Sequence, residues 1–527
     1  MQCLPATKHF GIIFLVLCIA ARSHASRLAA VVADRPHILL VVADDLGWND
    51  VGWHGSDIRT PVLDSLAAAG TTLEQYYVQP VCSPTRTSLL TGRYPMRYGL
   101  LHHVYPTGAR LGLPLNETLL PEKLNEAGYQ SHMIGKWHLG FYTWHHTPTF
   151  RGFQSFYGFY GGAEDYYAHS SGAGLSSHPN TGSRLSGLDL RNQTSADFNK
   201  MGVYSTPLFA SEAQRIIRNH AVSESDSPLF LYLAFQAVHS PQEVPQVYVD
   251  QYKNTISDMN RRKFAGMVSC LDEAIGNVTN TMKEMGLWKK TLMMFTTDNG
   301  GPVHTFSAIG ASNWPLRGSK HTLWEGGVRG SAFLHGPMLK KGTKYTGLMH
   351  ATDIFPTLIA AAGANTNHTL PLDGINQYDH ITAVANTSPR NEILFNYDPF
   401  APHGISNSGC CGYAGLRQGE WKLLVDPGGP DGWYQPGNTS NHDTHTIPEG
   451  LTIKNRTIYL FNPVVDPTEH NDVSKDNPEV VRKLMDRLEE YIKQSVPQGS
   501  QKIDPESDPS KHNGVWTPWV KDTESKV

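Results

Sequence analysis

The sequence is poor in cysteine, and this scarcity limits the kind of fold that it encodes. Only six of its 527 residues are cysteines, and two of these lie within the first 25 residues. The remaining four, which are too few to staple a large secreted chain, are Cys82, Cys270, Cys410 and Cys411. Cys410 and Cys411 either form a disulfide with each other, or one of them forms a disulfide with Cys270. Cys82 belongs to neither arrangement. A disulfide scaffold is therefore excluded.

The sequence also lacks an excess of either charge. It has 44 basic and 48 acidic side chains, with neither a basic block nor an acidic tail. Binding to nucleic acids depends on concentrated positive charge, so the balance excludes this partner class and gives no support to a membrane-surface protein. After the first 25 residues no apolar run is long enough to span a bilayer.

The first 25 residues resemble a secretory signal peptide. Lys8 precedes an apolar run from Phe10 to Ala21, and Ser23-His24-Ala25 offers small residues for cleavage. Seven Asn-X-Ser/Thr sites follow, at Asn116, Asn192, Asn277, Asn367, Asn386, Asn438 and Asn455. So many sites behind a signal peptide predict a glycoprotein of the secretory pathway, either lysosomal or extracellular.

Apolar strands that alternate with helices predict an α/β fold with a large, mostly parallel mixed sheet. The predicted buried strands span residues 37–42, 229–238 and 291–297, and helical patterns span residues 60–70 and 262–285. Each strand runs into a cluster of Asp, Asn or His. Because ligands bind beyond the carboxyl ends of such strands, the three clusters should share one site.

The character of the sequence changes after Pro371, where Gly, Pro, Asn and Ser become dense. Strands are expected at residues 421–425 and 457–461, followed by a helix over residues 478–494 that is capped by Asn477. We therefore expect a catalytic α/β domain over residues 26–375. A smaller α+β domain with an antiparallel sheet and one helix should cover residues 376–527.

Carboxylate and amide side chains follow two of the predicted strands. Asp44 and Asp45 follow the first strand, and Asp298 and Asn299 follow the third. Adjacent carboxylates usually cap a helix or lie in a solvated loop, and alone they would indicate nothing more. If the four side chains meet, their oxygen atoms suit a hard cation, Ca²⁺ or Mg²⁺, rather than zinc.

Cys82 opens the segment Cys-Ser-Pro-Thr-Arg-Thr-Ser-Leu-Leu-Thr-Gly-Arg. Pro84 fits the first turn of a helix, which places Cys82 at the positive helix end. A lone cysteine is ordinarily a small buried hydrophobe, and a thiolate nucleophile is the other interpretation from the residues alone.

These motifs resemble those of the sulfatase family. Residues 82–93 are similar to its first signature, Gly135-Lys136-Trp137-His138-Leu139-Gly140 to its second, and segments 297–300, 313–320 and 324–329 follow in family order. The resemblance runs from about Pro36 to the end of the chain and is greatest to the arylsulfatase B, I and J branch. It implies an alkaline-phosphatase-like fold and a sulfuric ester hydrolase.

The resemblance also implies roles for individual residues. Cys82 would be oxidised by the formylglycine-generating enzyme, and the hydrated aldehyde would be the nucleophile. One calcium ion would be held by Asp44, Asp45, Cys82, Asp298 and Asn299. Arg86 would hold the hydrate, Lys136 and Lys320 would bind sulfate, His138 would contact the hydrate and His239 would lie at the leaving oxygen. Substrate contacts would thus come from Lys136, His239 and Lys320.

The branch usually carries bridging cysteines that this sequence lacks, so the implied N-acetylgalactosamine 4-sulfate-like sugar and a small sulfated metabolite both stay open as substrates. Three alternatives to a sulfatase exist. A related phosphatase would cleave an aryl phosphate faster than the matched aryl sulfate. A silent sulfated-glycan-binding protein would keep Cys82 unmodified. A thiol hydrolase would be inactivated by alkylation of Cys82.

Overall fold

The computed structural model describes residues 35–173, 185–223, 226–303, 310–384, 387–401, 412–436 and 448–522. The predicted signal peptide, Asn386, Asn438, Cys410 and Cys411 lie outside these ranges. Among the described helices, none has the length and apolar character that a membrane span requires. The two described cysteines, Cys82 and Cys270, are both buried and free.

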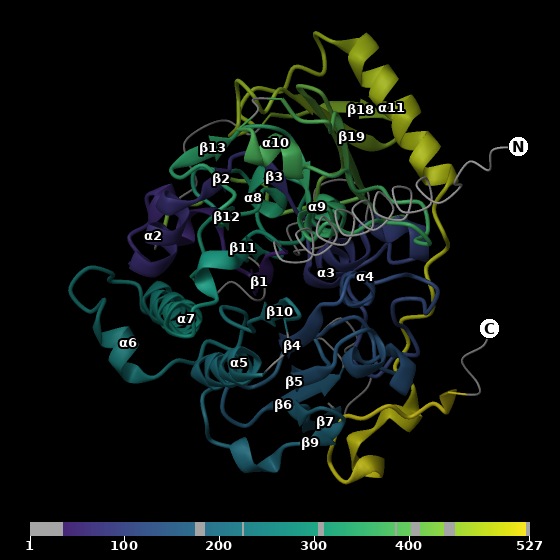
Figure 1. The fold of residues 1–527 in the computed structure, drawn as a ribbon. Coiled ribbons are helices and arrows are strands. Elements are labelled where there is room, and N and C mark those ends of the chain that lie inside the picture. Colours follow the sequence, from purple (N-terminus) through teal and green to yellow (C-terminus); the bar gives the residue numbers. More distant parts are fainter. Residues whose placement is uncertain are drawn as a thin grey trace, which may run out of the picture.

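A ten-stranded mixed sheet forms the centre of the molecule (Figure 1). Its strands, in spatial order, are β13 (Thr343–Tyr345), β2 (Thr71–Leu73), β12 (Ala332–His335), β11 (Thr291–Thr297), β1 (His37–Ala43), β10 (Leu229–Ala234), β4 (Gln130–Lys136), β5 (Ser155–Phe159), β8 (Arg191–Asn192) and β9 (Ser195–Ala196). The five strands from β11 to β5 are all parallel to their neighbours in this run. The predicted fold class is confirmed.

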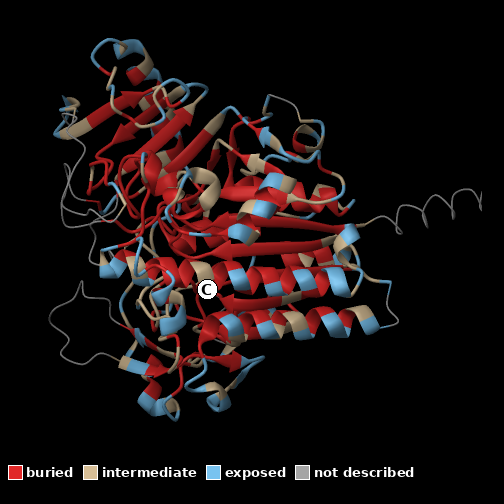
Figure 2. Cartoon of the chain, turned by 90° about the vertical axis from the view of Figure 1, so that its left-hand side faces the viewer, coloured by how far each residue is buried: buried red, intermediate tan, exposed pale blue. Residues whose placement is uncertain are grey.

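Helices cover both faces of the sheet because successive residues of its strands point to opposite sides. Leu39 and Val41 of β1 pack into one core with α2 (Pro61–Ala69), α5 (Ser205–Val222) and α7 (Met259–Glu284). Leu40 and Val42 pack into a second core with α3 (Cys82–Thr91), α4 (Leu120–Glu126) and α9 (Ile354–Ala361). Figure 2 shows buried and exposed residues alternating along the outer helices, as expected for helices with one face on a core.

Most predicted boundaries agree with the structure within three residues, but the strand predicted over residues 229–238 is too long. β10 ends at Ala234, and residues 235–238 leave the sheet. Val238 N donates to Asp44 O at 2.7 Å, and Asp44 N donates to Ala237 O at 3.0 Å. Phe235, Ala237 and Val238 are apolar because they are buried beside the end of β1, not because they extend a strand.

A second, five-stranded antiparallel sheet lies beside the first (Figure 1). Its order is β15 (Glu392–Tyr397), β16 (Ala414–Gln418), β17 (Trp421–Val425), β19 (Arg456–Phe461) and β18 (Leu451–Ile453). Helix α11 (Pro478–Lys493) packs on β16 and β17. Asn477 occupies its N-cap position, although its side chain makes no capping hydrogen bond. The strands and helix predicted for this region are confirmed.

The chain returns to the large sheet after α11. Trp516 is fully buried in the core beneath α3 and α4, and its backbone N donates to Leu188 O at 3.0 Å. The smaller elements are β3 (Tyr76–Tyr77) paired with β14 (Met349–His350), β6 (Ser170–Ala173) paired with β7 (Leu185–Leu188), and helices α6 (Gln246–Asp250), α8 (Glu325–Val328) and α10 (Tyr378–Thr382). The predicted division near residue 375 stays a prediction.

A buried lysine connects the small sheet to the catalytic side of the molecule. Lys422 of β17 lies 2.8 Å from Glu325 of α8 and 2.8 Å from Glu469. Burial and the neighbouring Glu325 raise the pKa of Glu469 to about 7, although Lys422 opposes them. One buried cation therefore holds two carboxylates that would otherwise repel each other.

We expect Lys422→Met to destabilise the protein by about 3 kcal/mol, because it leaves two carboxylates buried without their cation. Unfolding by denaturant measures the loss. Lys483→Met on the exposed side of α11 is the matched control and should change stability by less than about 0.5 kcal/mol. Equal effects of the two substitutions would contradict the role assigned to Lys422.

Candidate functional site

Four adjacent parallel strands end at one point, and polar side chains follow each of them. Asp298 and Asn299 follow β11, Asp44 and Asp45 follow β1, and His239 lies beyond β10. Lys136 is the last residue of β4, with His138 just after it. The shared site predicted from the strand ends is present in the fold.

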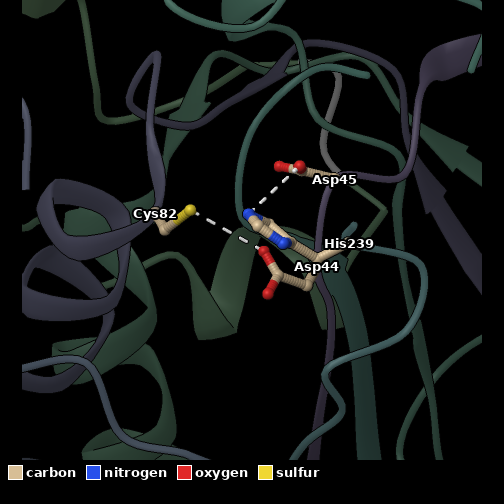
Figure 3. A group of neighbouring side chains, drawn as sticks. All are labelled: Asp44, Asp45, Cys82 and His239. Atoms are coloured by element: carbon tan, nitrogen blue, oxygen red, sulfur yellow. Dashed lines mark hydrogen bonds and ion pairs between the residues drawn. The ribbon is translucent and has the colours of Figure 1, made fainter. Parts of the chain in front are cut away.

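Cys82 approaches this point from the opposite direction, as the first residue of α3. Its Sγ lies 3.7 Å from Asp44 Oδ1, and Figure 3 shows Cys82, both aspartates and His239 facing a common centre. Every residue of α3 is buried, and Ser83 Oγ donates to His138 O at 2.9 Å. The positive end of a buried helix is thus aimed at the carboxylates.

Three cations match the three buried carboxylates. Lys136 Nζ lies 2.6 Å from Asp44 Oδ2, and Lys320 Nζ lies 2.7 Å from Asp45 Oδ1. Arg86 donates two hydrogen bonds to Asp298 Oδ2, at 3.0 and 2.8 Å. All six side chains are between 0 and 4% exposed. The sequence predicted that these residues meet, and the structure brings them together, while their roles stay predictions.

The charges give the three carboxylates different pKa values. Burial and the nearby Asp298 raise the pKa of Asp44 to about 7. Burial acts in the same direction on Asp45, but Lys320 and His239 outweigh it and hold the pKa of Asp45 well below its usual range. One carboxylate of the cluster therefore resists ionisation, because burial and a neighbouring like charge outweigh the effect of its cations.

The donor set fits a hard cation. Asn299 Nδ2 donates to Asp45 Oδ1 at 2.7 Å, while the buried Asn299 Oδ1 has no hydrogen-bond partner among the described residues. Potential ligand atoms of Asp44, Asp45, Cys82 and His239 lie within 4.8 Å of one another. A buried amide oxygen without a partner is costly unless something binds it. Aspartate and amide oxygens are the ligands that Ca²⁺ and Mg²⁺ prefer.

Two histidines border the cluster. His239 Nε2 lies 3.6 Å from Asp45 Oδ2, and the other ring nitrogen, Nδ1, lies 2.7 Å from Ser240 O. Donation to that carbonyl puts the proton on Nδ1 and turns Nε2 toward the site. Burial lowers the pKa of His239 to about 4 and the pKa of His138 well below its usual value. Both rings are neutral near pH 7.

Sequence reasoning missed the residues that hold these rings in place. Tyr166 donates a hydrogen bond from its hydroxyl to His239 O at 2.8 Å. At Gly162, a Cβ atom would lie 2.6 Å from the ring of His138. Gln236 in turn donates to Glu164 O. No spacing in the sequence links these positions to the strand ends, so only the folded loop reveals them.

The described glycosylation sites are open to modification. Asn116, Asn192, Asn277, Asn367 and Asn455 are all exposed. Exposure is what attachment of a bulky glycan requires. The predicted glycosylation at these five positions therefore fits the fold and stays a prediction.

Comparison with known proteins gives a consistent result. A family model described as Sulfatase matches residues 36–364. Mouse (Mus musculus) arylsulfatase J is 41% identical over 93% of this chain and 81% of its own length. Human (Homo sapiens) arylsulfatase A is 33% identical over 71% of this chain and 74% of its own. The crystal structure of Ps i-CgsB in complex with k-i-k-neocarrahexaose superposes with a TM-score of 0.72 at 28% identity, covering 89% of this chain and 95% of the other.

We expect added Ca²⁺ to raise the melting temperature of chelator-treated protein, because a ligand that binds only the folded state stabilises it by about 2.7 kcal/mol at a hundredfold excess over its Kd. Asn299→Ala should remove most of this shift, whereas Asn391→Ala on the exposed surface should keep it. Differential scanning calorimetry with and without Ca²⁺ measures the effect. An undiminished shift in Asn299→Ala would exclude Asn299 as a ligand.

A second expectation concerns pH and the Glu164–His169 pair behind His239. The Oε1 of Glu164 lies 3.2 Å from His169 Nδ1, and burial raises the pKa of Glu164 from 4.5 to about 7. A carboxyl whose folded-state pKa exceeds its unfolded value contributes stability that is complete below about pH 4.5 and is lost as the pH rises through about 7. For Glu164 this contribution amounts to about 3 kcal/mol.

Glu164→Gln removes this titration. The free energy of unfolding of the wild-type protein minus that of the variant should therefore decrease as the pH rises from 5 to 7.5. Denaturant unfolding at several pH values measures the difference. Glu489→Gln, at an exposed carboxylate on α11, is the control and should leave the difference flat. A difference that rises with pH would refute the assigned direction.

Proposed function

We propose that this chain, which belongs to the sulfatase family and hydrolyses sulfate esters, does so with a formylglycine made from Cys82 and one bound calcium ion. The observation that carries the proposal is the convergence of Cys82, three carboxylates, an unpartnered Asn299 oxygen and three cations at one buried point. A sulfate monoester is an anion, so the nucleophile and substrate repel each other unless positive charge surrounds them.

The calcium ion would be held by Asp44, Asp45, Asp298, Asn299 and the modified residue 82, and when bound it would supply a positive charge that polarises a sulfate oxygen. The formylglycine hydrate would supply two hydroxyls on one carbon, one able to attack sulfur and one whose later loss of a proton would release the sulfate. This explains the need for the modification, since a serine or cysteine has no second hydroxyl with which to release sulfate.

The protein's own side chains would each have a separate role in binding the substrate and the hydrate. Lys136 at the end of β4 and Lys320 in the loop before α8 bind the sulfate oxygens. Asp45 outweighs burial and raises the pKa of Lys320, so that lysine stays charged. Arg86 holds the hydrate against Asp298, to which it donates two hydrogen bonds. These contacts neutralise and orient the substrate before any bond breaks.

His138 and Lys320 would handle protons. His138 is neutral and close to α3, so it can accept a proton from the hydrate. His239 lies 3.6 Å from Asp45, where it would contact the leaving group. The proton for the leaving oxygen would come from Lys320, because the neutral ring of His239 carries its proton on Nδ1, toward Ser240. The exposed glycosylation sites support the predicted passage through the secretory pathway to the lysosome or the exterior.

The test is mass spectrometry of the peptide that contains Cys82, from protein made in its own secretory pathway. We expect a residue in which the thiol sulfur is replaced by an aldehyde oxygen. Cys82→Ser should lower turnover of 4-nitrophenyl sulfate by at least about a hundredfold, because serine lacks the second hydroxyl. Alkylation of thiols should leave the converted enzyme active.

The conservative variant Cys270→Ser is the matched control, since Cys270 is buried in α7 away from the cluster and should tolerate the change. An unmodified Cys82 in active protein, or faster cleavage of 4-nitrophenyl phosphate than of the sulfate, would refute the proposal.

A further inference from the structure

A row of aromatic rings leads from the site to the protein surface. His321 follows Lys320 and lies against His103, with ring centres 5.9 Å apart. His103 contacts His102 at 3.9 Å, and His102 contacts Phe400 at 5.7 Å. Exposure rises along the row, from 7% at His321 to 60% at Phe400. The row therefore runs from a residue beside the buried cluster to the protein surface.

The position of this row is fixed relative to Cys82. Tyr105 N donates to Ser83 Oγ at 3.3 Å, and Ser83 is the residue after Cys82 in α3. On the other side, Leu101 N and His102 N both donate to Gln498 Oε1, at 2.6 and 3.0 Å. The loop that carries His102 and His103 is thus tied to the start of α3 and to the segment after α11.

A buried carboxylate orients His102. Asp398, directly after β15, is fully buried, and its Oδ2 lies 2.6 Å from His102 Nδ1. The same carboxylate accepts a hydrogen bond from Phe400 N at 2.9 Å through its other oxygen. Because the carboxylate holds the proton on Nδ1, the nitrogen that a ligand meets is Nε2. The side chain of His102 is 23% exposed, so a ligand can reach it.

Cys82, Lys136 and Lys320 are at most 4% exposed, so a sulfate ester that binds beside them has to extend its alcohol portion outward. The row of rings that begins at His321, next to Lys320, reaches the surface from there. The alcohol portion then meets an oriented imidazole nitrogen and the exposed ring of Phe400. A hydroxyl donates to the first, and the flat apolar face of a sugar ring packs on the second.

We propose that His102 and Phe400 bind the alcohol portion of the substrate and that Asp398 positions His102. The inference rests on the proposed sulfatase chemistry and extends it to the leaving group. His102 Nε2 accepts a hydrogen bond from a sugar hydroxyl, and a simple aryl sulfate has no such hydroxyl.

The experiment compares 4-nitrophenyl sulfate with N-acetylgalactosamine 4-sulfate and N-acetylgalactosamine 6-sulfate, using converted wild-type enzyme and variants. His102→Ala should lower kcat/KM on the sugar that is cleaved by about tenfold, mainly through KM, and change kcat/KM on the aryl ester less than threefold. His102→Gln, which retains a hydrogen-bonding side chain, should recover part of the loss. Asp398→Asn should act in the same direction as His102→Ala.

His145→Ala is the matched control, because His145 is half exposed beside the carboxylate of Asp522 and away from the row. Phe400→Ala removes an exposed ring, so it tests the path even if the His102 variants fold poorly, and it should raise KM for the sugar. Equal losses on the aryl ester and the sugar would overturn the inference, as would a wild-type enzyme that cleaves the aryl ester and neither sugar. A wild-type enzyme without activity on the aryl ester would instead refute the proposed function.

Discussion

Repulsion among three buried carboxylates is the constraint on which the rest of the structure depends. Parallel pairing of β11, β1 and β10 brings Asp298, Asp44 and Asp45 together out of water, which is unfavourable unless positive charge accompanies them. Arg86, Lys136 and Lys320, from three other segments, each pair with one of these carboxylates and compensate its charge. The same positive charges suit a sulfate anion, so the groups that make the cluster tolerable are also those that a substrate would meet.

Local contacts determine how this cluster faces its surroundings. The start of α3 presents Cys82, and the loop after β5 keeps the neighbouring rings in place through Tyr166 and Gly162. These contacts are backbone hydrogen bonds and close steric approaches rather than charges. The charged side chains thus favour an anionic ligand, and the packing of α3 and of the loop after β5 sets how Cys82 and the histidines face that ligand.

The second sheet takes part in the same arrangement. Lys422 joins β17 to Glu325 of α8, and Asp398 after β15 orients His102 at the entrance. Residues 498–501, in the segment after α11, also contact the loop that carries His102. Residues that are distant in sequence from Cys82 therefore hold the loop that lies beside the start of α3.

The sequence by itself determined the α/β class, most strand and helix bounds and the membership of the cluster, because apolar periodicity and the motif around Cys82 are local signals. The sequence overextended β10, since Phe235, Ala237 and Val238 are apolar through burial at the end of β1 rather than through a place in the strand. Only the tertiary structure decided that Asn299 Oδ1 lacks a partner, that Tyr166 holds His239 and that Asp398 meets His102 across 296 positions. Such contacts follow from how strands and loops are placed in space, which no spacing along the chain encodes.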